Sequence, residues 1–204
     1  STGASANPTD LKNTHLGEGT LQARYIRGAS GGKPFTLGKY ENTRTRAAIA
    51  ELAANGGMPM GFYTRFTDPE ARRVITQYYR FIRNNAAIYR HNTPHADAVL
   101  LYPRKAVHAG DISHVGAFRQ TGRALLDRHV LFDILPDDIA TPERLSAYKK
   151  VYHPGDGAAE GHAKFSAPST VRISASRPAT GGALHLHFVN YNRTEPSPPK
   201  SPGG

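Results

Sequence analysis

Short apolar segments alternate with capped helical segments along most of this chain, and no other feature limits its possible folds as strongly. In the first half, Phe35–Tyr40 and Met60–Phe66 are typical of strands, and a helical pattern follows each of them. Parallel strands need a long crossover, which is usually a helix, so we expect these two strands to lie side by side and parallel. The alternation therefore predicts an α/β fold.

Start and stop residues define the two helices of this half. Asn42 or Thr43 can cap the first helix, and Gly56-Gly57 ends it. The second helix begins at Thr67-Asp68-Pro69-Glu70, which supplies a cap, a proline in the first turn and an acid near the positive end of the helix dipole. Apolar side chains recur at helical spacing along this second helix, and arginines occupy its opposite face.

One more strand is predicted before these elements. Residues 1–19 are typical of a loop, and Thr20–Arg27 has the composition of a strand that ends at the glycine-rich Gly28–Gly32. Residues 20–83 are therefore predicted to run strand, strand, helix, strand, helix.

The second half continues the alternation after a predicted linker at His91–His95. The continuous apolar run Ala98–Tyr102 is typical of a strand buried on both faces. The elements predicted after it are a loop from Pro103 to Gly110, a helix capped by Asp111 or Ser113, a strand at Val130–Leu135, a short helix from Thr141 and a third strand at Val151-Tyr152. This order favours a parallel sheet of the doubly wound type.

The last part of the chain changes pattern. Ser169–Ser176 and Ala183–Asn190 each alternate apolar and polar residues, which predicts a β hairpin with a long turn. A lone hairpin is marginal in water, so we expect it to pack on another surface. Residues 196–204 are rich in proline and glycine, and we expect a disordered tail there.

Composition excludes several function classes. Because the sequence has no cysteine, it can form no disulfide, thiolate metal site or cysteine nucleophile. The net charge of +10 favours polyanions such as sulfated glycans, but the basic residues are scattered and no aromatic nucleic-acid motif occurs, so we do not expect a nucleic-acid partner. No apolar run is long enough to span a membrane, and the sequence is compatible with both a cytoplasmic and a secreted protein.

Three stretches together resemble a known family: Gly32–Glu41 with its following helix, Leu100 to Asp138, and Leu186–Tyr191. With them the chain resembles bacterial glycoside hydrolases of the family-42 β-galactosidase type. In that family a β/α barrel precedes a flavodoxin-like trimerisation domain and a small β domain. The resemblance implies an N-terminal loop at 1–19, partial β/α-barrel units at 20–93, a partial flavodoxin-like parallel sheet at 94–154, a C-terminal β hairpin region at 155–195 and the tail at 196–204.

The resemblance also implies missing parts. A whole barrel takes about 250 residues, whereas fewer than 95 precede the flavodoxin-like region in this sequence. The early barrel strands, which would carry the general acid, have no counterpart here. We therefore expect the chain to be incomplete and to lack glycosidase activity on its own.

Glu41 is the candidate nucleophile. It ends a strand, where a barrel directs side chains into its pocket, and it resembles the nucleophile position of the family, whose retaining chemistry uses two carboxyls ~5 Å apart. Lys39 could occupy that place instead, and a carboxylate near a helix N-terminus is also stabilised without any catalytic role. We expect Lys39, Tyr40, Tyr63 and Arg65 to bind substrate, since a tyrosine ring can stack on a sugar and an arginine can bond its hydroxyls.

The other polar candidates have simpler explanations. His108 and Asp111 follow a strand end, where open sheets bind ligands, but no nucleophile elbow occurs there, so a subunit contact or a solvated loop is favoured. His185 and His187 share one strand face but make too few ligands for zinc, so we expect no metal and no cofactor.

Three functions stay open at this point. The first is a glycoside hydrolase-like protein of the retaining β-galactosidase type with a carbohydrate partner. Because residues 95–195 resemble a region used for subunit association, the second is a non-enzymatic assembly or scaffold component, present as a homo-oligomer or in a larger complex. The third is an anionic-glycan-binding protein, which the net charge favours.

Overall fold

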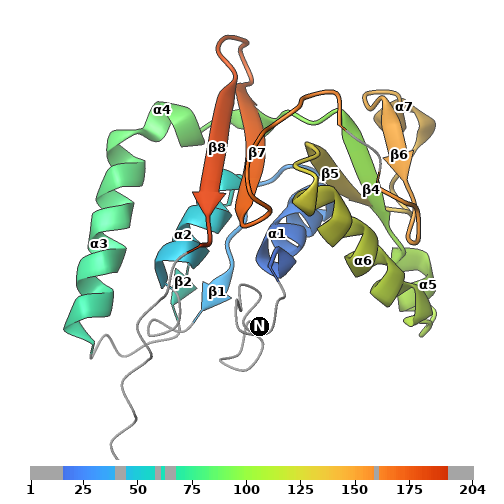
Figure 1. Ribbon diagram of the computed structural model, residues 1–204, viewed down its shortest axis with the longest axis horizontal. Helices are drawn as coiled ribbons and strands as arrows, with labels where there is room; N and C mark the ends of the chain where they lie inside the picture. The colour runs from blue at the N-terminus through green and yellow to red at the C-terminus, as the bar shows by residue number, and fades with distance from the viewer. Residues whose placement is uncertain (1–15, 40–44, 58–60, 63–67, 159–160, 193–204) are drawn as a thin grey trace, which may run out of the picture.

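The computed structural model describes residues 16–39, 45–57, 61–62, 68–158 and 161–192. These residues form a mixed α/β protein with parallel and antiparallel sheets, and no barrel closes among them (Figure 1). The helices are α1 (Glu18–Ala29), α2 (Thr45–Ala54), α3 (Pro69–Asn84), α4 (Ala86–Tyr89), α5 (Arg104–His108), α6 (Ser113–Asp127) and α7 (Pro142–Leu145). The strands are β1 (Gly38–Lys39), β2 (Gly61–Phe62), β3 (Asn92–Pro94), β4 (Ala98–Tyr102), β5 (Phe132–Pro136), β6 (Lys150–Tyr152), β7 (Val171–Pro178) and β8 (His185–Asn190).

The first pair of strands has the predicted arrangement. Gly38 pairs with Gly61 and Lys39 pairs with Phe62 in parallel register. The parallel pairing of the two strands is confirmed, although each described strand is shorter than the sequence predicts. The helices between and after them are also confirmed: Gly56, with φ +83°, follows the end of α2, and Asp68 caps α3 by accepting from the backbone N–H groups of Glu70 and Ala71.

The prediction of a strand at Thr20–Arg27 is wrong, because these residues lie in α1. The helix buries Leu21 on the side of the parallel sheet and Ala23 against α2. Its buried face also includes Thr20 and Arg24, which are polar. Hydrophobic periodicity counts only apolar residues. The apolar residues here recur at every second position, as in a strand: Leu21, Ala23 and Tyr25.

The second half contains the predicted parallel sheet, with strand order β5-β4-β6. Leu100 and Ile134 face α1 and α6, whereas Val99 and Leu101 pack on the other face with Leu145 of α7. The sheet is therefore covered on both sides, which explains why β4 is a continuous apolar run.

Two loop predictions in this half are wrong. Residues 104–108, expected in a loop, form the short helix α5. Residues 92–94, expected in a linker, form β3, which pairs antiparallel with β7. β3 is short and lacks apolar alternation, so only its partner strand, distant in sequence, makes it a strand.

The predicted hairpin is confirmed and becomes part of a larger sheet. β7 and β8 pair antiparallel, and the full order is β3-β7-β8. This sheet does pack on another surface: Ser174 Oγ donates to the carbonyl of Ala54 in α2, and Arg24 Nη2 donates to the carbonyl of Ile173. In Figure 1 β7 and β8 stand in front of α2, with α3 on the left and the parallel sheet on the right. No described helix has the length and apolarity needed to cross a membrane.

Helix α1 approaches its neighbours closely at a glycine. A Cβ on Gly28 would lie 1.8 Å from the carbonyl oxygen of Ile134 in β5. Because a backbone atom cannot rotate away, only glycine fits there. Gly116 of α6, by contrast, has no heavy atom within 4 Å of where its Cβ would lie.

We predict opposite effects for the same substitution at these two glycines. Gly28→Ala should lower the free energy of unfolding by about 1–3 kcal/mol, because α1 must move off β5. Gly116→Ala should raise it by about 0.5–1 kcal/mol, because alanine favours a helix interior and nothing obstructs it. Urea unfolding of both variants measures the difference; a neutral Gly28→Ala would show that α1 does not contact β5 as described.

Candidate functional site

The candidate site lies at the carboxyl edge of the β1–β2 pair. Lys39 and Phe62 are register partners at the ends of the two strands, so the segments that follow β1 and β2 begin at the same edge of the pair. In β/α enzymes that edge carries the catalytic groups. Glu41, Tyr40, Tyr63 and Arg65 follow these strand ends in sequence but lie outside the described residues, and Lys39 is described in its backbone alone. Their predicted roles therefore stay predictions.

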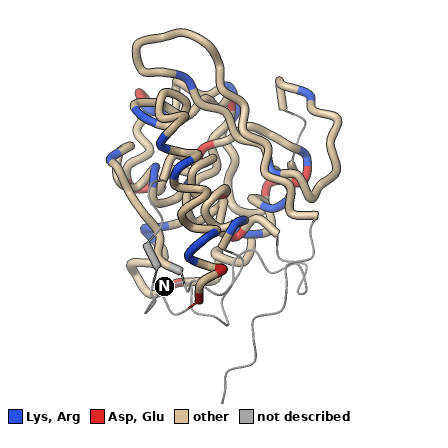
Figure 2. Tube along the Cα trace, turned by 90° about the vertical axis from the view of Figure 1, so that its left-hand side faces the viewer, with Lys and Arg blue, Asp and Glu red and all other residues tan. Residues whose placement is uncertain are grey.

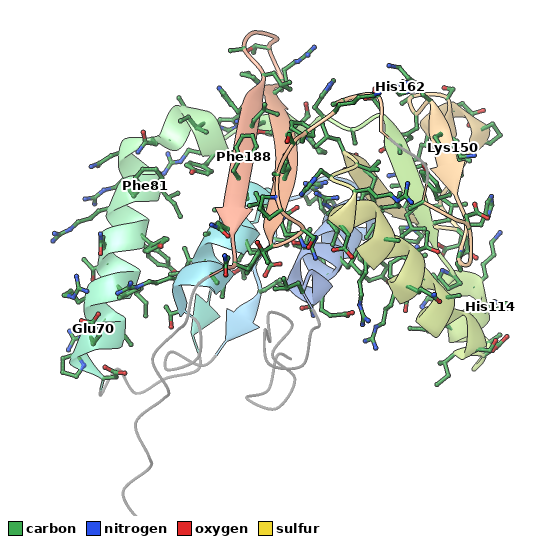
Figure 3. All side chains as sticks on the ribbon, in the orientation of Figure 1. Glu70, Phe81, His114, Lys150, His162 and Phe188 are labelled. Carbon is green, nitrogen blue, oxygen red and sulfur yellow. The ribbon has the colours of Figure 1, made fainter. Side chains whose placement is uncertain are left out.

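The helices that follow the two strands are held together at their first turns. Arg46 near the start of α2 and Arg73 of α3 both bind the carboxylate of Glu70, at 3.4 and 2.7 Å. The hydrogen bond from Arg73 and the nearby charge of Arg46 hold the pKa of Glu70 below its usual value. Figure 3 labels Glu70 at the lower end of α3. The contact connects the first turns of α2 and α3 at the surface.

A buried polar cluster, which the sequence did not predict, lies at the centre of the molecule. Arg24 is 2% exposed, and its Nε donates to Asn55 Oδ1 while its guanidinium lies over the Phe132 ring, 4.5 Å from the centroid. Burial, together with the nearby charges of Arg27 and Arg172, lowers the pKa of Arg24 to about 9. No described carboxylate forms an ion pair with it.

Arg27, one turn further along α1, forms the ion pair of this cluster. Its guanidinium binds the carboxylate of Asp133 in β5, and both side chains are mostly buried. The second oxygen of Asp133 accepts from the hydroxyl of Tyr148 at 3.0 Å. Burial and the negative charge of Asp133 raise the pKa of Tyr148.

A second polar contact joins the start of α1 to α2. Thr20 Oγ1 donates to Glu51 Oε1 at 2.7 Å, and both side chains are buried. Tyr191, directly after β8, is buried beside them, and burial with the charge of Glu51 raises the pKa of its hydroxyl well above the usual value. Because this cluster is enclosed, it binds elements to one another and offers no open site.

The edge of the second sheet is also occupied by internal contacts. Arg104 after β4 binds both carboxylate oxygens of Asp138 after β5, each at 2.9 Å from Nε. The backbone N–H of Lys105 donates to Asp137. Two neighbouring strand ends are thus connected directly. His108 and Asp111, the sequence candidates at this edge, are both exposed.

The two histidines of β8 lie on one face of the strand, as predicted. His185 Nδ1 lies 3.3 Å from Asn92 Nδ2, and His187 Nε2 lies 3.2 Å from Ser176 Oγ. Partial burial, helped by the neighbouring His185, lowers the pKa of His187. Within the described residues, no three His, Asp or Glu side chains come together in a group that could hold a metal ion.

The chain shares its fold with part of a solved glycoside hydrolase. That structure is alpha-L-fucosidase isoenzyme 2 from Paenibacillus thiaminolyticus, with a TM-score of 0.51 at 22% sequence identity. The match covers 67% of this chain and 23% of the fucosidase chain, so it corresponds to only a part of that enzyme. At this identity the likeness shows the fold alone. No family model matches the chain, and no curated protein sequence matches it significantly.

We predict that the buried ion pair matters far more than the exposed one. Asp133→Asn leaves Arg27 without its partner charge in a mostly buried place, and should cost about 3 kcal/mol of unfolding free energy. The same change at Asp138, whose side chain is 30% exposed, should cost less than about 1 kcal/mol. Equal losses in urea unfolding would contradict the assigned burial.

A second prediction concerns pH. Because the pKa of His187 is lowered in the folded state, the unfolded state binds the proton more readily as the pH falls through the usual histidine value of 6.5. Stability should therefore drop below that pH, and His187→Gln should reduce the drop. His162→Gln, at an exposed position, is the control. Urea midpoints above and below pH 6.5 measure the effect; an unchanged drop in His187→Gln would refute it.

Proposed function

We propose that this chain is glycoside hydrolase-like, of the retaining β-galactosidase type, with Glu41 as its carboxylate nucleophile. The observation that carries the proposal is the parallel register of β1 and β2. It brings to one edge the two strand ends that Glu41 and Tyr63 follow in sequence. The shared fold with part of a fucosidase supports the same class of chemistry.

The proposal extends to the parts of the fold. Residues 20–93 correspond to partial barrel units, since they contain a parallel strand pair in which each strand is followed by a helix. Residues 94–154 correspond to a partial flavodoxin-like domain, because their three strands form a parallel sheet with helices on both faces. Residues 155–195 correspond to the beginning of a β domain.

The proposed chemistry needs two carboxyl groups. In a retaining glycosidase one carboxylate attacks the anomeric carbon while a second carboxyl group protonates the leaving oxygen. Glu41 supplies the first group, and an acid on an earlier barrel strand supplies the second. Because we assign no general acid among these 204 residues, we expect the chain alone not to cleave substrates whose leaving group needs a proton.

A fluorosugar with an activated leaving group tests Glu41 without the missing acid. Dinitrophenolate departs without protonation. The probe is therefore a dinitrophenyl β-galactoside with fluorine in place of the hydroxyl next to the anomeric carbon. It needs only the nucleophile to react. We predict a covalent adduct on Glu41, located by peptide mass spectrometry. Glu41→Gln should abolish the adduct, because an amide cannot attack.

Glu143→Gln is the matched control. Glu143 is an exposed carboxylate in the first turn of α7, far in sequence from the candidate site, and its loss should leave labelling unchanged. An adduct on another carboxylate, or the same yield in Glu41→Gln, would reject Glu41 as the nucleophile. Labelling by the corresponding α-fucoside alone would keep the glycosidase class and reject the β-galactosidase type.

A second candidate function, assembly, rests on the outer face of β8. Leu184, Leu186 and Phe188 are 40%, 42% and 57% exposed, and β8 is an edge strand. Exposed apolar side chains on a sheet edge favour pairing with another chain.

We predict that light scattering at micromolar concentration finds an oligomer. Leu186→Lys with Phe188→Lys should convert it to a monomer, because charges on the outer face of β8 oppose burial. The control is Ile112→Lys, at a position that is 70% exposed beside α6. A monomeric wild-type chain would remove this candidate.

A further inference from the structure

Helix α3 has two contrasting faces. One buries Ala71, Val74 and Ile75 against the α2 side of the molecule. The opposite face is cationic and open to solvent. In Figure 2, where the left side of Figure 1 turns toward the viewer, blue segments recur along this helix.

Most of the positive charge on this face has no internal partner. Arg73 is paired with Glu70 at the start of the helix. On this face, four exposed arginines form no ion pair or side-chain hydrogen bond with a described residue: Arg72, Arg80, Arg83 and Arg90. Arg90 follows α4 and lies beside the last turns of α3, where it borders the same surface as Arg80 and Arg83. Four neighbouring guanidinium groups are thus available to an external anion.

Two hollows follow this cationic face. The first, of ≈ 690 Å³, lies along the helix between Arg72 and Asn84 and includes Gln77 and Phe81. The second, of ≈ 580 Å³, lies between α3 and Arg90, and Arg80 borders both. Phe81 is 55% exposed, and Figure 3 labels it on the upper half of α3. The two hollows meet at Arg80 and together form a shallow, open surface along α3, the cationic trough, with charges along its length.

We propose that this face of α3 binds a linear anionic polysaccharide, one that carries sulfate or carboxylate groups. Along the helix axis Arg72 and Arg80 are ~12 Å apart and Arg72 and Arg83 are ~16 Å apart, which spreads the cations over several sugar units. Guanidinium groups bind oxyanions through paired N–H donors, and Gln77 and Asn84 can bond sugar hydroxyls between them. The apolar ring of Phe81 can cover a sugar face.

A nucleic-acid duplex fits this surface less well. A helix in the major groove lies between two phosphate backbones, and basic side chains on both of its sides contact them. On the α2 side, Arg46 is already bound to Glu70. Among the described residues, Arg90 is the basic side chain that borders the trough from outside α3, and it lies on one side only. A polysaccharide that follows the helix axis contacts all four unpaired arginines, whereas a duplex does not.

This proposal does not depend on Glu41 or on glycosidase chemistry, because none of its four arginines belongs to the proposed catalytic edge. The ligand is held by charge and hydrogen bonds, and no bond is made or broken. Either proposal can fail while the other stands.

Binding of a size-defined heparin oligosaccharide tests the trough. We expect the 204-residue chain to bind it at ~0.15 M salt and to stay on a heparin column up to ~0.5 M, where diffuse surface charge is screened. A variant with Arg72, Arg80, Arg83 and Arg90 all changed to Gln should lose at least tenfold in affinity. Glutamine has a helix propensity close to that of arginine, so α3 should persist, as circular dichroism would verify.

The matched control removes the same charge elsewhere. Lys33, Lys105, Arg128 and Arg177 are exposed and lie outside α3 and α4, and their change to Gln also lowers the net charge from +10 by four, to +6. This control should lose less than threefold. If the fourfold α3 variant unfolds, Arg80→Glu against Arg128→Glu repeats the comparison with single changes. Equal losses in variant and control, no heparin binding, or tighter binding of a short DNA duplex would each overturn the proposal.

Discussion

The structure depends on a buried arginine. The guanidinium of Arg24 in α1 donates to Asn55 beside α2 and to a backbone carbonyl of β7, and it lies over the Phe132 ring of β5. A buried cation is costly unless all its surroundings are in place. The parallel sheet, the α2 layer and the antiparallel sheet must therefore assemble around α1 together. The fall of the pKa of Arg24 to about 9 reflects this enclosure.

The polar contacts that hold the fold together lie apart from the two candidate functional surfaces. The polar contacts of α1 are enclosed and bind elements to one another, whereas the candidate catalytic edge lies at the ends of β1 and β2 and the cationic trough lies along α3. Since α2 connects α1 to α3, the same packing that encloses Arg24 also sets the position of the helices that follow the two short strands. The likeness to part of a fucosidase concerns the fold alone.

Local chemistry made several elements predictable from the sequence. Asp68 and Pro69 determine where α3 begins, and the apolar run at β4 predicted a strand covered on both faces. The strand pair of the candidate site was predictable because its crossover helix demanded parallel pairing. The elements that were missed depend on partners distant in sequence. α1 buries Thr20, Arg24 and Arg27 through contacts with Glu51, Asn55 and Asp133, which no hydrophobic pattern contains. β3 is a strand only because β7 pairs with it.

Hydrogen exchange at the Nε–H group of Arg24, followed by NMR of the nitrogen-labelled chain, tests most directly whether this arginine joins the two sheets. The account predicts exchange as slow as that of the slowest core amides, because Nε–H is buried and bound to Asn55. The exposed Nε–H of Arg72 provides the rapid reference in the same sample. If Arg24 exchanged as fast as Arg72, its side chain would reach solvent, and the account of a chain assembled around α1 would be wrong.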